Sequence, residues 1–169
     1  MKLIKINKVR YRKHLNIIIV GFIATLLILA LIFGQLLIQA FSQEGVSNFK
    51  YNLLGVILSL LACAAILHSL KKSEFFNEIY YVWQIKQIQN LIYRKLKKIK
   101  NSAKDCDENA LLVLVFYYKS LQQIYELDDN TLTISAVNKE VNDLQEIITH
   151  NNLIIDVDLF DKKLINLWS

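Results

Sequence analysis

The stretch LNIIIVGFIATLLILALIFGQLLIQAF, residues 15–41, contains 27 residues and no charged side chain. At about 1.5 Å per residue, a helix of this length covers roughly 40 Å, which exceeds the roughly 30 Å hydrocarbon core of a bilayer. The stretch is also longer than the about 7–15 apolar residues of a secretory signal peptide, and no small-residue cleavage motif follows it. It therefore predicts an uncleaved transmembrane helix over residues 15–41.

A second uncharged stretch predicts another transmembrane helix over residues 52–70, after a short periplasmic loop at 42–51. Basic residues flank the pair on both outer sides, with six of them and no acid in residues 1–14 and two more at 71 and 72. Because basic residues concentrate on the cytoplasmic side, both termini are expected in the cytoplasm. The expected location is the bacterial inner membrane, with residues 71–169 forming a cytoplasmic domain.

Small residues recur at four-residue spacing in both apolar stretches. They are Ala30 and Gly34 in the first, and Gly55, Ser59 and Cys63 in the second. Such a stripe lets helix backbones approach closely. It indicates packing within the hairpin or a seam between copies of the chain, and the pattern alone does not choose between them.

Residues 71–169 contain neither glycine nor proline, the residues that most often interrupt regular structure. The segment is read as about four helices joined by short polar turns, the last of them opening at Asp158. The predicted fold is an all-α membrane protein, a two-helix transmembrane hairpin followed by a cytoplasmic helical bundle.

In the first helix of the cytoplasmic bundle, apolar residues recur at 3- and 4-residue intervals, as in a coiled coil, with one polar interruption. This helix seam comprises Val82, Ile85, Gln89, Ile92, Leu96 and Ile99.

Basic residues gather at both ends of that first helix. Lys71 and Lys72 adjoin the second apolar stretch, where anionic lipid headgroups attract lysine. The cluster further along comprises Arg94, Lys95, Lys97, Lys98 and Lys100. The favoured contact for this cluster is the acidic segment that follows it in the chain, because residues 105–169 carry twelve acids against four lysines. No nucleic-acid-binding motif accompanies these residues, so no nucleic acid is expected.

The segment YELDDNTLT, residues 125–133, raises the question of a metal site or a carboxylate pair. A calcium loop of the EF-hand type fails when counted from either aspartate, because the required glycine and the spaced oxygen ligands are missing. The segment is instead read as a turn at Asp128 to Asn130. The next helix then starts at Thr131, Thr133 or Ser135, and Ser135 is a plausible N-cap. No phosphate loop, zinc motif or nucleophile motif occurs, so no catalytic, metal or cofactor-binding residue is predicted.

Six segments together resemble a known family: RYRKHLN (10–16), IFGQLLI (32–38), NLLGV (52–56), YYVWQIKQ (80–87), IYRKLKKIK (92–100) and YYKSLQQIYELDDNTLT (117–133). The chain is similar to two-span inner-membrane proteins of gammaproteobacteria, domain-of-unknown-function family three-zero-eight-seven. The resemblance runs nearly end to end and weakens after about residue 151. It implies a bacterial inner-membrane location and supports the hairpin, but it implies no catalytic residue.

Three functional hypotheses follow. The leading one is a non-enzymatic membrane protein whose cytoplasmic helices bind another membrane protein or a second copy of the chain. The first alternative is a small transport or channel subunit made of oligomerised hairpins. It rests on the small-residue stripes and on Gln35 and Gln39, which share a face near the outer end of the first apolar stretch. The second is a membrane-bound enzyme using Asp128 and Asp129, or using His14 and His68.

Overall fold

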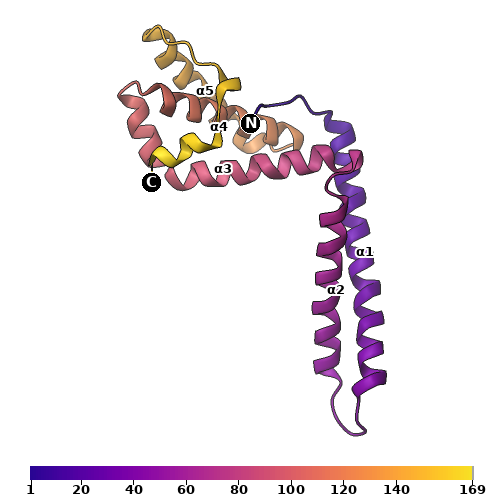
Figure 1. Cartoon of the computed structure of the whole chain (residues 1–169). Helices are drawn as coiled ribbons and strands as arrows, with labels where there is room; N and C mark the ends of the chain where they lie inside the picture. Colours follow the sequence, from indigo (N-terminus) through magenta and orange to yellow (C-terminus); the bar gives the residue numbers. More distant parts are fainter. Residues whose placement is uncertain (169) are drawn as a thin grey trace. The chain divides into compact units, whose positions relative to one another are not determined.

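The structure is a computed structural model that describes residues 1–168 (Figure 1). In this part of the chain, five α-helices and two 3-10 helices account for the regular structure, and no strand is present. Two long apolar helices come first and a helical bundle follows, which confirms the predicted fold class. The chain divides into a hairpin unit, residues 13–79, and a helical unit, residues 1–12 together with 80–168.

The hairpin unit is built from α1 (Lys8–Phe41) and α2 (Phe49–Leu70), and both helices are long and apolar enough to cross a membrane. Most of their large apolar side chains point outward, and Leu31 is 70% exposed. α1 and α2 end at Phe41 and Leu70, the last residues of the two uncharged stretches, and α2 begins at Phe49, three residues before residue 52. The first helix begins earlier, at Lys8, because the basic residues before the apolar stretch are good helix formers and no glycine or proline interrupts them.

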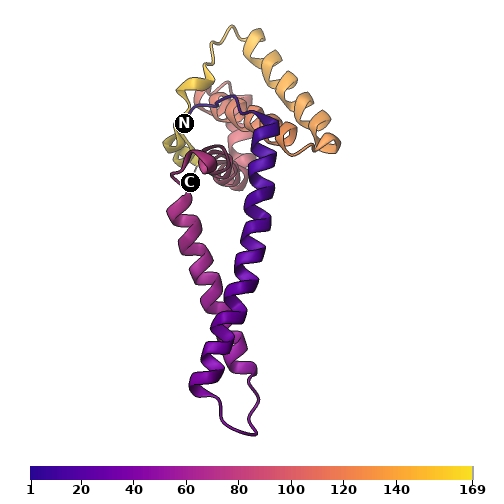
Figure 2. The same ribbon diagram turned by 90° about the vertical axis from the view of Figure 1, so that its right-hand side faces the viewer.

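α1 and α2 cross at two glycines (Figure 2). A Cβ added to Gly55 would lie 2.6 Å from the backbone nitrogen of Gly34 and 3.2 Å from the carbonyl oxygen of Ala30. This spacing is too short for any side chain, so glycine is required at position 55. At the loop end, the hydroxyl of Tyr51 donates a hydrogen bond to the carbonyl of Phe41 over 2.5 Å.

The helical unit contains α4 (Glu108–Leu127), α5 (Thr131–His150) and most of α3 (Glu74–Lys104). α4 is its centre, because ten of its side chains are buried and it packs against α5. Asp107 caps the start of α4, where its carboxylate accepts hydrogen bonds from the backbone N–H groups of Asn109 (2.9 Å) and Ala110 (3.3 Å). Such a cap satisfies donors that the first turn of a helix leaves without partners.

The C-terminal segment is helical, as expected, but it forms 3-10 helices instead of an α-helix. These are η1 (Val157–Leu159) and η2 (Lys162–Trp168). Between them, Phe160 stacks on Phe116 of α4 with ring centroids 3.7 Å apart. Two buried side chains in η2, Ile165 and Trp168, continue this attachment. The segment therefore covers the core through a few large side chains, and a continuous α-helical stripe is not needed.

Candidate functional site

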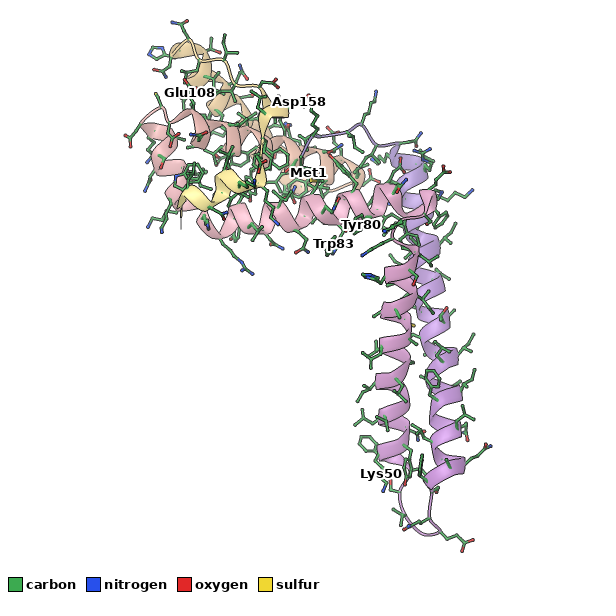
Figure 3. All side chains as sticks on the ribbon, in the orientation of Figure 1. Met1, Lys50, Tyr80, Trp83, Glu108 and Asp158 are labelled. Atoms are coloured by element: carbon green, nitrogen blue, oxygen red, sulfur yellow. The ribbon has the colours of Figure 1, made fainter. Side chains whose placement is uncertain are left out.

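The first residues of the chain form part of the helical unit (Figure 3). The N-terminal ammonium of Met1 donates to the carbonyl of Phe160 over 2.9 Å. The backbone N–H of Ile4 donates to the hydroxyl of Tyr81 (3.0 Å), and Gln123 Nε2 donates to the carbonyl of Ile4 (2.5 Å). Residues 1–12 are therefore held by backbone hydrogen bonds to α3, to α4 and to the segment after η1. Nothing in the composition of the first fourteen residues indicated this attachment.

The acidic turn, Asp128–Asn130, binds the basic residues that face it. Asp128 ends α4 and accepts a hydrogen bond from Lys86 Nζ over 3.0 Å. Asp129 has a left-handed backbone (φ 55°) and pairs with both Lys8 and Arg12. Both carboxylates thus join the N-terminal segment and α3 to the turn, and this gives them a structural role that needs no metal ion or reaction.

Of the three starts considered for the next helix, Thr131, Thr133 and Ser135, the structure has the first, because α5 begins at Thr131, directly after Asn130. Asp129 has a left-handed backbone (φ 55°), which does not continue the helical path of α4, and it lies in the short turn between Leu127 and Thr131. Asn130 occupies the capping position without a side-chain cap hydrogen bond.

The helix seam of α3 lies in the core of the chain's own helical unit. Val82, Ile85, Ile92 and Ile99 are buried, and Leu96 is half-buried. Gln89, the polar interruption, is 8% exposed and donates through Nε2 to the hydroxyl of Ser120 on α4 over 3.0 Å. Ser120 in turn donates to the carbonyl of Tyr117 over 2.7 Å.

Sequence reasoning missed Ile88, which is also buried. It lies next to Gln89 in the sequence and therefore falls outside the strict seam. A bundle helix buries a wider apolar stripe than a coiled-coil seam does, and a pattern of that width would have included Ile88.

The basic cluster of α3 divides into residues with partners inside the chain and residues without. Lys100 Nζ lies 2.8 and 2.9 Å from the two carboxylate oxygens of Glu140 on α5. Lys95 Nζ donates to the carbonyl of Ile165 over 3.1 Å. Within residues 1–168, Arg94 and Lys97 make no hydrogen bond or ion pair, and both are exposed.

The Lys100–Glu140 contact shifts the titration of both groups. The hydrogen bond from Lys100 lowers the pKa of the Glu140 carboxyl. Partial burial is the largest single influence on the Lys100 ammonium and lowers its pKa, but the hydrogen bonds and charges of Glu140 and Tyr118 together outweigh it and raise the pKa of Lys100. Burial also raises the pKa of the nearby Tyr118 hydroxyl to about 12, and Lys100 Nζ lies 5.6 Å from the centre of that ring. All three groups thus keep their neutral-pH charge states over a wider pH range than in free side chains.

The side of α3 that faces away from α4 and α5 combines aromatic and basic side chains. It comprises Tyr80, Trp83, Tyr93, Arg94 and Lys97, and we call it the basic–aromatic face. Figure 3 labels Tyr80 and Trp83 on α3. Tyr80 and Trp83 stack with ring centroids 5.6 Å apart. Trp83 is 53% exposed and Tyr93 is 67% exposed. From residue 79 to residue 104, α3 contains seven basic residues and no acidic one.

A shallow, open depression lies along the C-terminal half of this face. Its lining includes Tyr93, Arg94, Lys97, Lys100 and Lys104. One aromatic ring and several cations therefore line a single depression, and this composition suits a ligand with negative charge.

The remaining candidate residues, apart from Lys98, lie in the hairpin unit. Ser59 and Cys63 are buried, like Gly34 and Gly55, while Ala30 is half-buried. Lys72 is exposed, and Lys71 Nζ lies 3.2 Å from a ring nitrogen of His68. Lys98, in the helical unit, is exposed and contacts other residues of the chain.

The two histidines near the basic end of the hairpin have different neighbours. The ring of His14 stacks on Phe75, with centroids 4.0 Å apart, whereas His68 lies beside Lys71. No group of three His, Cys, Asp or Glu side chains arranged to hold a metal ion occurs within residues 1–168.

No curated protein and no solved structure matches the chain. A family model does match, and its description is Protein of unknown function (DUF3087). It covers residues 1–165 and thus includes both apolar helices, the basic–aromatic face and the acidic turn. The chain belongs to this family, as the resemblance of its sequence segments predicted.

Proposed function

We propose that this is an integral protein of the bacterial inner membrane that works as a membrane-anchored docking module for an acidic protein partner. The hairpin crosses the bilayer twice, the loop between α1 and α2 lies outside, and both termini lie in the cytoplasm. The attachment of residues 1–12 to residues 80–168 supports this topology, because two segments in one compact unit lie on the same side of a membrane. The basic residues on both outer flanks of the hairpin give the cytoplasm as that side.

The basic–aromatic face carries the docking proposal. Tryptophan, tyrosine and arginine are the residues that contribute most to protein interfaces, and Trp83, Tyr93 and Arg94 are exposed on this face. Arg94 and Lys97 have no partner within residues 1–168, whereas Lys100 and Lys95 do. A complementary acidic surface would satisfy the free cations and speed association.

No specific observation favours the transport alternative. That alternative was based on the stripe of small residues, which could join several hairpins, and on the face that Gln35 and Gln39 share. At Gly55, however, the space beside the helix is occupied by Gly34 and Ala30 of the same chain.

The docking proposal is tested by purifying tagged full-length protein from native membranes in a mild detergent. The wild type is compared with the double variant Arg94→Glu/Lys97→Glu. The matched control is Lys119→Glu/Lys163→Glu, which makes the same charge change at exposed lysines of the helical unit that lie outside the face. We expect the wild type and the control to retain one acidic protein in fixed stoichiometry, and the face variant to lose it.

Two results would contradict docking to a protein. One is the absence of a stoichiometric partner in the wild type, or equal retention by all three proteins. The other comes from fluorescence in nanodiscs, where Trp83 is exposed and Trp168 is buried and serves as an internal reference. Quenching of Trp83 by brominated lipids would place the face on the bilayer surface instead.

Topology is tested separately by reporter fusions at each terminus and by labelling a single cysteine placed at Gly45 in the loop. Gly45 has a left-handed backbone (φ 79°) in the turn between α1 and α2, so the cysteine is better placed at its exposed neighbour Val46 if Gly45→Cys proves unstable. Cytoplasmic termini and a periplasmic loop are expected. A terminus found outside would refute the membrane placement.

A further inference from the structure

An apolar cavity of about 380 Å³ lies within the hairpin unit, between the N-terminal half of α1 and the C-terminal half of α2. α1 contributes Gly21 and Phe22 to its lining, and α2 contributes Cys63 and Leu67. Phe75, just after α2, also lines it. Ligand pockets commonly measure about 300–1,000 Å³, so this cavity is large enough to hold part of a small molecule.

The cavity exists because the two helices separate away from their crossing. They approach closely where Gly55 meets Gly34, and they diverge toward the other end of the hairpin (Figure 2). The surroundings of the two glycines agree with this, although Gly21 is itself exposed. A Cβ added to Gly55 would clash with backbone, whereas a Cβ added to Gly21 would have no atom within 4 Å. The space beside Gly21 is therefore open, and a larger side chain could fill it.

Cations gather at the end of the hairpin where the cavity lies. Ser73 lines the cavity, and Lys71 and Lys72 come immediately before it in the chain. Lys13, in the first part of α1, adds a third positive charge to this end, and Glu74 adds a negative one. None of these lysines lines the cavity itself, but Lys71 and Lys72 adjoin its lining residue Ser73 in the chain, and we call this pair the rim. An apolar chamber beside two cations matches a molecule that has a hydrocarbon chain and a negatively charged head.

We propose that this cavity is a binding site for one anionic glycerophospholipid, with an acyl chain between α1 and α2 and the phosphate against Lys71 and Lys72. The proposal rests on the membrane placement proposed above, since only that placement exposes the cavity to lipid. An acyl chain gains little hydrophobic free energy on leaving the surrounding lipid. Selectivity must then come from the charged rim, and two lysines near a bilayer surface correspond to a roughly tenfold or greater preference for an anionic headgroup.

The chamber is tested by filling it. Full-length protein is reconstituted in a defined mixture of phosphatidylethanolamine and phosphatidylglycerol, extracted in mild detergent and examined by native mass spectrometry. Gly21→Leu fills the cavity, and Ala24→Leu places the same side chain on an exposed position of α1 that does not line it. We expect the wild type and Ala24→Leu to retain one phosphatidylglycerol per chain, and Gly21→Leu to retain about tenfold less.

The rim is tested with the double variant Lys71→Gln/Lys72→Gln. We expect lipid to remain bound while the preference for phosphatidylglycerol over phosphatidylethanolamine falls by about tenfold. Lys50→Gln, at the opposite end of α2, is the control and should leave the preference unchanged. Equal preference in the wild type and the double variant would overturn the role of the lysines.

The labelling rate of Cys63 gives a second measurement of lipid binding, made in nanodiscs and not after detergent extraction. Its side chain is 2% exposed and lines the cavity. Its labelling by a lipophilic maleimide in nanodiscs should speed up when phosphatidylglycerol is replaced by phosphatidylcholine. The proposal is overturned if the rate of Cys63 labelling is the same with both headgroups. It is also overturned if Gly21→Leu and Ala24→Leu retain equal amounts of lipid, or if the retained molecule is uncharged. The reporter fusions test topology independently, so a wrong placement would be told apart from a wrong ligand.

Discussion

Lys8, at the start of α1, pairs with Asp129, which lies 121 residues later in the turn between α4 and α5. Arg12, one helical turn after Lys8, pairs with the same carboxylate. The turn is therefore a point where the beginning of the chain and its helical unit are held together. Because the paired side chains are about half exposed, their attraction is screened by salt.

Asp129→Asn should loosen the N-terminal segment without disturbing the turn. Asparagine tolerates the left-handed backbone at this position as well as aspartate does. The lost ion pairs are expected to lower the unfolding free energy by about 1 kcal/mol or less. Hydrogen exchange of residues 1–12 should become faster than in the wild type.

The difference should vanish in about 1 M salt, where the Debye length is about 3 Å. Asp143→Asn, an exposed carboxylate of α5, is the control and should leave the exchange of residues 1–12 unchanged. Unchanged exchange in Asp129→Asn at low salt would show that the backbone hydrogen bonds of Met1 and Ile4 are sufficient by themselves.

Ser120→Ala should destabilise the helical unit, because it leaves the buried amide of Gln89 without its partner on α4. A buried polar group without a hydrogen bond costs about 1–3 kcal/mol. Gln89→Leu combined with Ser120→Ala should cost less than the sum of the single changes, because both ends of the hydrogen bond are then removed. Urea unfolding followed by circular dichroism measures all three variants, and strict additivity would contradict the coupling.

Glu140→Gln should flatten the pH dependence of stability on the acid side. The pKa of Glu140 is lower in the folded chain than in the unfolded one. Its contribution to the unfolding free energy is therefore present above the unfolded pKa of about 4.5 and is lost as the pH falls through the folded pKa. The pKa of Lys100 is raised, so its contribution is lost only as the pH rises beyond about 10.5.

The unfolding free energy of the wild type should therefore fall between about pH 5 and pH 3 more steeply than that of Glu140→Gln. Partial exposure of both side chains keeps the effect to about 1 kcal/mol or less. Glu146→Gln, at an exposed position of the same helix, should follow the wild type. Identical profiles for Glu140→Gln and the wild type would rule out the contribution.

Gly55→Ala should weaken the contact between α1 and α2, because its methyl group would lie within 3 Å of the backbone of Gly34. Overpacking of this kind costs about 1–3 kcal/mol. Gly21→Ala is the matched control, since its methyl group meets no atom within 4 Å. The two variants are compared by thermal unfolding in detergent and by size-exclusion chromatography with light scattering. A lower melting temperature with unchanged mass is expected for Gly55→Ala, whereas a changed mass would indicate that position 55 joins separate copies of the chain.

The sequence by itself determined the elements that depend on composition and local period. The uncharged stretches end at Phe41 and Leu70, and the helices end there too, because an apolar run long enough to span a bilayer is also long enough to form a stable helix. The apolar period of α3 likewise identified Ile85, Ile92 and Ile99, which are buried because one face of a bundle helix must leave water. The reading of Asp128–Asn130 as a turn came from residue types that favour turns.

Only the tertiary structure decided which surfaces meet. The attachment of Met1 and Ile4 to the helical unit depends on backbone hydrogen bonds, and these leave no mark on side-chain pattern. The partner of Gly55 and the cavity beside Gly21 depend on the crossing of two helices, although both glycines look alike in the sequence. Local patterns record what each segment prefers over a few residues, whereas these contacts join residues far apart in the chain and exist only after the segments have packed.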